Sequence, residues 1–242
     1  FARLRQRAVE IAAAGQLPFP PPGGVGVGLA GIVNPRAGWL KLAGALRLAD
    51  CDLRGPVEAA FGCRAAVECD SNAGALADLY FGEAREADNV LYVSWGTGLG
   101  AGLVIHRRLY HSRLDAMGEF GHTQVDGGAG RPCYCGCRNC LEAQAGAKAI
   151  EETVTERLGR PVAFREIVER ASSGEPCMRD ALLDAARAIA RALAGALVLF
   201  NPDVVVLGGG ASHCLPLVRE AFDQELGRRT PSFALRDTTI AL

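Results

Sequence analysis

Long apolar runs are missing from this sequence, and their absence excludes membrane-spanning and secreted proteins. No uninterrupted apolar stretch approaches the roughly 20 residues that a membrane-spanning helix needs. The N-terminal segment 1–15 carries several arginines but no apolar core of a secretory signal. Low-complexity tracts and internal repeats are missing too. We therefore expect a cytoplasmic protein with no membrane partner.

An excess of charge of either sign is also lacking. The chain has 26 Lys and Arg against 27 Asp and Glu, for a formal net charge of −1. It therefore has no electrostatic footprint for nucleic acid, and any contact with DNA must come from sequence outside this chain. A composition that is 49% hydrophobic, with 30 glycines among 242 residues, is typical of a compact α/β protein.

Apolar strands that alternate with amphipathic helices support the same fold class. The expected helices cover residues 3–14, 56–62, 71–84, 141–156, 178–199 and 213–228, with Ser71 as the cap of the third. The expected strands cover residues 24–33, 64–69, 89–95 and 203–207. Within residues 96–105 a glycine-rich turn leads into a further strand, and another strand begins near residue 238. Several of these strands end in glycines, which predicts ligand sites at strand ends.

Nine cysteines are present, and four of them (Cys133, Cys135, Cys137 and Cys140) fall within eight residues. In a cytoplasmic protein such a cluster favours a metal over disulfides, although core cysteines remain an alternative. His122 precedes the cluster, and a glycine-rich spacer can fold its imidazole back onto the thiols. We predict a closed structural Zn²⁺ site with His122, Cys133, Cys135 and Cys140 as its ligands. Cys137 is a fifth candidate whose part is left open.

Two motifs in this region, GEFGH (118–122) and CYCGCRNCLE (133–142), resemble the zinc signature of the ROK family of repressors, open reading frames and kinases. Further matches extend the resemblance over essentially the whole chain. They are GLAGIVNP (28–35), VECDSNAGALADLYFG (67–82), GTGLGAG (96–102) and NPDVVVLGGG (201–210).

The resemblance implies an actin-like ATPase (ribonuclease H-like) fold, with two α/β lobes and a central cleft. The N-terminal lobe would cover residues 1–86, and the C-terminal lobe, with the zinc loop, residues 87–242. Family members begin with a DxGGT phosphate strand and continue past a final strand into closing helices. We therefore expect this chain to be clipped at both ends. Members are commonly homodimers or homotetramers.

The resemblance also assigns site residues. Sugar binding falls to Gly31, Asp70, Glu119, His122 and Glu142, with Asp70 as the catalytic base in the kinases. Nucleotide binding falls to Gly96, Thr97, Gly98, Gly208 and Gly209. The residues themselves allow simpler explanations: a helix cap or an Asp turn for Asp70, a hairpin turn for 96–98, and a tight strand-to-helix turn for 208–210.

Some residues depart from the family pattern, and they point in part to a repressor and in part to a kinase. Cys69 stands where the kinases have an Asn, and a thiol is a weak hydrogen-bonding group. HTQVD (122–126) and CYCG (133–136) resemble the N-acetylglucosamine repressor and its relatives, whereas the intact GTGLGAG loop is typical of the kinases.

We therefore expect the sugar-sensing and oligomerisation domain of a transcriptional repressor, which contacts DNA only through an N-terminal domain absent here. The alternative is an ATP- and Mg²⁺-dependent hexose or N-acetylhexosamine kinase. A scaffold that binds neither sugar nor ATP is the third hypothesis. In the first two, the zinc loop would hold Glu119 and Glu142 in place for the sugar.

Overall fold

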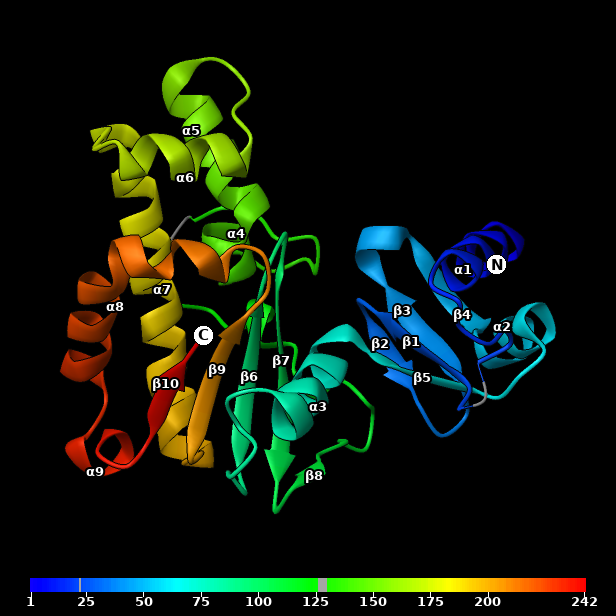
Figure 1. Ribbon diagram of the computed structural model, residues 1–242. Coiled ribbons are helices and arrows are strands. Elements are labelled where there is room, and N and C mark those ends of the chain that lie inside the picture. The colour runs from blue at the N-terminus through cyan, green and yellow to red at the C-terminus, as the bar shows by residue number, and fades with distance from the viewer. Residues whose placement is uncertain (22, 126–129) are drawn as a thin grey trace. The chain divides into compact units, whose positions relative to one another are not determined.

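The computed structural model describes residues 1–21, 23–125 and 130–242 (Figure 1). Its α-helices are α1 (Ala2–Ala14), α2 (Arg54–Phe61), α3 (Asp70–Phe81), α4 (Glu142–Ala145), α5 (Ala147–Leu158), α6 (Phe164–Ser172), α7 (Pro176–Phe200), α8 (Leu215–Arg229) and α9 (Ser232–Leu235). Three short 3₁₀ helices are η1 (Gly44–Leu46), η2 (Phe120–His122) and η3 (Ser212–Cys214). Among the described residues, no helix is both long and apolar enough to cross a membrane.

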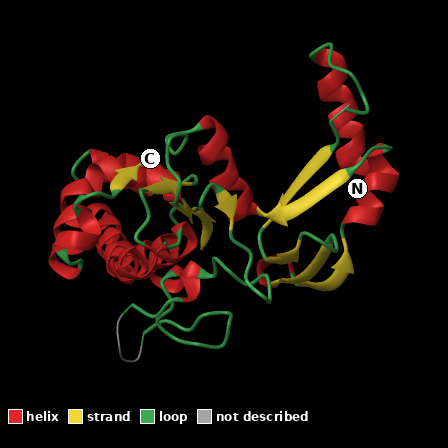
Figure 2. Ribbon diagram, turned by 90° about the horizontal axis from the view of Figure 1, so that it is seen from below, coloured by secondary structure: helices red, strands yellow, loops and turns green. Residues whose placement is uncertain are grey.

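The strands are β1 (Val25–Leu29), β2 (Ile32–Asn34), β3 (Trp39–Ala43), β4 (Leu48–Asp52), β5 (Ala65–Cys69), β6 (Val90–Trp95), β7 (Leu99–Ile105), β8 (Arg108–Leu109), β9 (Val204–Gly208) and β10 (Thr239–Ala241). The chain forms two compact units: unit 1 holds residues 1–73 and 111–116, and unit 2 holds 74–110 and 117–242. Figure 2 shows helices beside the strands of each unit. The lobe boundary near residue 86 stays a prediction.

Unit 1 contains a parallel pair, β1 with β5, and an antiparallel sheet in the order β2-β3-β4. The single strand predicted over 24–33 is wrong, because the chain turns between β1 and β2 at Gly31. This glycine has a φ of +140°, and a Cβ there would lie 2.4 Å from the Leu42 carbonyl oxygen. Only glycine permits that backbone conformation and that close approach.

Unit 2 is built on a five-stranded sheet in the order β10-β9-β6-β7-β8. Side chains alternate across it, as the period of a strand requires. Leu91 and Val93 of β6 belong to one core cluster with residues of α7, while Val90 packs in a second cluster with Leu79 of α3. Helices therefore cover both faces of the sheet, which confirms the predicted α/β class.

Helix α7 contributes more buried residues than any other described helix. Pro176 occupies its first position, where a missing N–H costs nothing, and Asn201 ends it with a left-handed backbone (φ 40°). Its alanines allow close approach to its neighbours, and larger side chains such as Ile189 and Leu193 fill the core. The predicted helix over 178–199 is confirmed.

Two predicted helices differ from the structure. Helix α3 begins at Asp70 and ends at Phe81, so Ser71 lies in its first turn and is not its cap. The helix predicted over 141–156 is divided into α4 and α5, because Gly146 adopts an extended conformation (ψ 149°). A Cβ at Gly146 would lie 2.8 Å from the Thr97 carbonyl oxygen, so tertiary packing sets this break.

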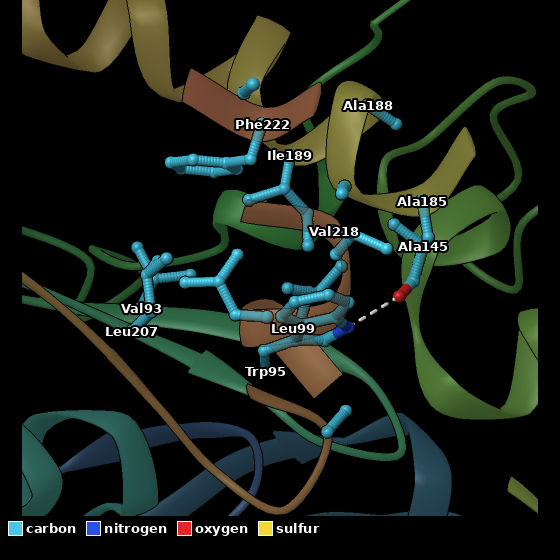
Figure 3. Close-up of a cluster of buried hydrophobic side chains, with 14 of the residues drawn as sticks. Val93, Trp95, Leu99, Ala145, Ala185, Ala188, Ile189, Leu207, Val218 and Phe222 are labelled. Carbon is cyan, nitrogen blue, oxygen red and sulfur yellow. Dashed lines mark hydrogen bonds between the residues drawn. The ribbon is translucent and has the colours of Figure 1, made fainter. Parts of the chain in front are cut away.

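The two tryptophans of the chain offer a matched test of the core of unit 2. Trp95 is 0% exposed and donates from Nε1 to the Ala145 carbonyl oxygen at 2.8 Å (Figure 3). Trp95→Phe leaves that buried acceptor unsatisfied, so we expect a loss of about 1–3 kcal/mol in the free energy of unfolding. Trp39, the control, is 37% exposed and donates from Nε1 to Asp50 Oδ1 at 2.8 Å. Because water can replace this exposed hydrogen bond, Trp39→Phe should cost less than about 1 kcal/mol. Urea denaturation followed by circular dichroism measures both, and equal losses would contradict the prediction.

Glu225 gives unit 2 a pH-dependent contact between α8 and α7. Its side chain is 7% exposed and accepts from Arg191 at 2.9 Å and from Arg229 at 2.7 Å. The hydrogen bond from Arg191, followed by that from Arg229, lowers the pKa of this carboxyl. Its contribution to stability is therefore complete above the unfolded-state pKa of about 4.3 and is lost as the pH falls through the lower folded-state pKa.

We accordingly expect wild type to be more stable than Glu225→Gln at pH 7, with the difference shrinking below about pH 4. Glu220→Gln, at an exposed site on the same helix, should show no such pH dependence. Thermal unfolding at several pH values tests this. A difference that stays constant down to pH ~2 would argue against the ion pairs.

Candidate metal centre and its polar neighbours

A tight hairpin carries the clustered cysteines at residues 133–140 of unit 2. The Cys133 N–H donates to the Cys137 carbonyl at 2.8 Å, and the Gly136 N–H donates to the Cys133 carbonyl at 3.0 Å. Gly136 has a φ of +91° and Asn139 a φ of +61°, conformations that glycine and asparagine adopt most readily. These bonds and backbone conformations define the tight turn of the hairpin.

Four predicted ligands converge here: the ligand atoms of His122, Cys133, Cys135 and Cys140 all lie within 4.8 Å of one another. Cys133 Sγ lies 3.5 Å from His122 Nδ1, and Cys135 Sγ lies 3.6 Å from Cys140 Sγ. A tetrahedral ion with bonds of ~2.3 Å to sulfur and ~2.0 Å to nitrogen separates its ligand atoms by about 3.4–3.8 Å. The cluster therefore fits a metal ion.

Two sequence predictions about this loop have different outcomes. Cys137 is exposed and is not among the four converging residues. The glycine-rich spacer, predicted to fold His122 back, includes residues 126–129, which lie outside the described residues.

The thiols differ in acidity. Burial raises the pKa of Cys140 to about 12 and also raises the pKa of Cys133. The backbone N–H of Cys137 lowers the pKa of Cys135. Because a metal binds thiolates, loading this cluster must release protons to solvent.

The GEFGH segment is held against β7 by its two glycines. A Cβ at Gly118, whose φ is +96°, would lie 1.9 Å from the Ala101 carbonyl oxygen, and a Cβ at Gly121 would lie 2.3 Å from that of Leu99. The Ala101 N–H also donates to the Gly118 carbonyl at 2.7 Å. These contacts fix η2, and with it His122, at the edge of the sheet.

The imidazole of His122 has a different neighbour at each nitrogen. Nδ1 faces Cys133, while Nε2 lies 3.0 Å from the Tyr134 hydroxyl and 3.5 Å from Glu119 Oε2. Sequence analysis missed Tyr134 because neither spacing nor residue type distinguishes it from an ordinary loop tyrosine.

Glu142 begins α4 and reaches the turn between β6 and β7. Its Oε2 accepts from the Leu99 N–H at 2.8 Å, and a Cβ at Gly98 would lie 2.3 Å from the same oxygen. Glycine at position 98 therefore makes room for the carboxylate. Glu119, His122 and Glu142, three of the predicted sugar-binding residues, all belong to unit 2.

The predicted nucleotide-binding glycines also lie in unit 2. The Gly96 N–H donates to the Gly98 carbonyl at 3.0 Å, and the carbonyls of Gly96 and Thr97 accept from the first N–H groups of α5. Thr97 is exposed. These contacts describe a tight turn whose carbonyls accept hydrogen bonds from the N-terminus of α5. Phosphate binding by this turn stays a prediction.

The second glycine segment follows β9. A Cβ at Gly208 would lie 2.3 Å from the Tyr92 hydroxyl oxygen. A Cβ at Gly209, whose φ is +91°, would lie 2.5 Å from the Trp95 carbonyl oxygen. Packing of the sheet accounts for both glycines, and their part in nucleotide binding stays a prediction as well.

Gly31 and Asp70 belong to unit 1. Asp70 is exposed at the start of α3, and its Oδ1 accepts from the Ser71 N–H at 2.7 Å and from the Cys69 thiol at 3.5 Å. Behind it, Glu68 accepts from the Asn72 amide at 3.0 Å and pairs with His111 at 2.8 Å. Sequence reasoning missed this pairing, because no motif links residues so far apart.

Comparison with known proteins identifies the family. The ROK family model matches residues 15–238, and the chain belongs to that family. The xylose repressor of Caldicellulosiruptor bescii is 29% identical over 220 residues, which cover 86% of this chain and 55% of the repressor. The chain spans about half the length of the curated relatives it matches.

Two solved structures illustrate both branches of the family. A ROK transcriptional regulator, a homologue of the E. coli MLC protein, is 28% identical with a TM-score of 0.85, covering 99% of this chain and 63% of its own. A Streptomyces griseus glucokinase in complex with glucose and AMPPNP is 28% identical with a TM-score of 0.80, covering 90% of this chain and 75% of its own. These neighbours confirm the actin-like ATPase fold class; the central cleft stays a prediction.

Metal stoichiometry can separate the four converging ligands from Cys137. We expect Cys140→Ser to reduce bound metal to well below one ion per chain, because a hydroxyl is a poor substitute for a thiolate. Cys137→Ser, a matched change in the same loop, should leave about one ion bound. Mass spectrometry under native conditions, with elemental analysis, measures both. Loss of metal in Cys137→Ser would make that thiol a ligand and refute the assignment.

Proposed function

We propose that this chain is the sugar-sensing and oligomerisation domain of a ROK transcriptional repressor, with a structural Zn²⁺ at the cysteine cluster. The observation that carries the sugar site is the arrangement of His122, which turns one nitrogen to the metal cluster and the other to Glu119. A closed set of one imidazole and three thiolates suits zinc in a structural role.

The polar groups near the cluster suit a polyol. Carboxylates accept hydrogen bonds from neighbouring hydroxyls, and an imidazole can donate or accept, so together they can distinguish the hydroxyls of a sugar ring. Glu119 and Glu142 flank the metal loop in sequence, and both lie on segments that contact β7 or the turn before it. The part of Gly31 and Asp70, which belong to unit 1, in sugar binding stays a separate prediction.

The repressor assignment has two supports. One similar structure is named a ROK family transcriptional regulator, and several curated relatives are named xylose repressors. In addition, Cys69 stands where kinases of the family carry an Asn, whose amide is a good hydrogen-bond donor. Its thiol, which contacts Asp70, is a weak donor. In a repressor, a sugar that binds one arrangement of the lobes more tightly would shift the population toward it and so change DNA binding by a domain outside this chain.

A sugar kinase is the second candidate, and a specific observation favours it. Asp70 is exposed at a helix start, where its carboxylate could accept a proton from a sugar hydroxyl. ATP and Mg²⁺ would then bind at the glycine turns 96–98 and 208–209. The similarity to a glucokinase crystallised with glucose and AMPPNP supports this alternative.

Calorimetry tests sugar binding with D-xylose, D-glucose and N-acetyl-D-glucosamine on the zinc-loaded full-length protein. We expect one of them to bind, and Glu119→Gln to weaken that binding by about 10-fold or more, as expected for the loss of a charged acceptor. Glu169→Gln, an exposed site on α6, is the control and should bind as wild type does. Absence of binding by all three sugars would refute the proposal.

The same protein separates repressor from kinase. A repressor should release no ADP from ATP with any of the three sugars, and sugar should change its affinity for operator DNA. Sugar-dependent ADP release that disappears in Asp70→Asn would establish the kinase instead.

A further inference from the structure

Tyr134 lies in the metal hairpin between two of the converging cysteines. The residue is 66% exposed, yet its hydroxyl lies 3.0 Å from His122 Nε2. The phenol and imidazole rings meet edge-on, with centroids 5.0 Å apart and an interplanar angle of 78°. The hydroxyl of this exposed tyrosine therefore contacts the His122 imidazole.

The hydroxyl meets the nitrogen that the metal cluster does not use. Nδ1 faces Cys133, so a metal on Nδ1 leaves the hydrogen of the neutral imidazole on Nε2. That hydrogen can be donated to the Tyr134 oxygen or to Glu119, whose Oε2 lies 3.5 Å away.

We propose that Tyr134 determines sugar affinity, because its hydroxyl occupies on His122 Nε2 the position that a sugar hydroxyl takes. This inference rests on the proposed sugar-binding function and adds a residue to it. The hairpin provides its own substitute for the ligand, which keeps the imidazole hydrogen-bonded while the site is empty. Sugar binding then requires the Tyr134 side chain to rotate away.

Rotation of one side chain leaves the metal cluster in place. The backbone of the hairpin is fixed by the bonds from Cys133 to Cys137 and from Gly136 to Cys133, and neither involves the phenol. The zinc ligands therefore stay where they are while the hydroxyl leaves. Glu119 remains beside Nε2 in either state.

The competition predicts a gain of affinity when the hydroxyl is removed. Tyr134→Phe keeps the ring against the imidazole and deletes only the competing oxygen. We expect its dissociation constant for the sugar that wild type binds, from the panel of D-xylose, D-glucose and N-acetyl-D-glucosamine, to fall by about 2- to 10-fold, the range that one net hydrogen bond covers. Tyr80→Phe removes another exposed phenol hydroxyl, from α3, and should leave the constant unchanged.

A second measurement uses the wild-type chain. In protein labelled with ¹³C-tyrosine, one of four tyrosine signals, assigned by its loss in Tyr134→Phe, should shift on addition of sugar as the ring leaves the imidazole. The Tyr80 signal, assigned in the same way, should not move. Zinc content, measured on each variant, should equal that of wild type.

The outcomes separate this inference from the proposed function. Equal or weaker sugar binding by zinc-loaded Tyr134→Phe, or a Tyr134 signal that does not respond to bound sugar, would overturn the role of Tyr134 while sugar binding itself stands. Loss of zinc in Tyr134→Phe would overturn it too, since the hydroxyl would then support the metal. Failure of wild type and variant alike to bind any sugar of the panel would overturn both.

Discussion

Close backbone contact between the GEFGH segment and β7 is the constraint on which the candidate site of unit 2 depends. Side chains at Gly118 or Gly121 would collide with carbonyl oxygens of that strand. With both glycines in place, η2 lies against the sheet, and His122 reaches the cysteine hairpin. Glu142, which follows the hairpin in the sequence, contacts the same strand by accepting from the Leu99 N–H.

In the proposed site, this shared anchor lets a structural metal support ligand binding. The ion would fix the orientation of the His122 imidazole, and the second nitrogen of that ring would contact the sugar. Glu119 lies beside that imidazole, on the segment held against β7, while Glu142 accepts from the Leu99 N–H of the same strand. In our proposal, metal binding and ligand recognition are coupled through His122, whose Nε2 also contacts the Tyr134 hydroxyl.

The core of unit 2 supplies the rigidity that such a site needs. Trp95 ends β6 within the main core cluster and donates to the Ala145 carbonyl at the end of α4, so the helix that carries Glu142 is tied to the sheet. Helix α7 packs behind both, and the ion pairs of Glu225 join it to α8. Precise placement of the polar groups follows from a dense apolar core.

Sequence alone predicted the family, the α/β class and the four residues that converge as candidate metal ligands, because three of the four lie close together in the chain and strand alternation is a local pattern. Tertiary structure decided the breaks at Gly31 and Gly146, where neighbouring carbonyls approach too closely for a side chain. It also decided the contacts of Tyr134 with His122 and of His111 with Glu68. Those pairings depend on how the chain folds back on itself, and no local spacing of residues encodes that.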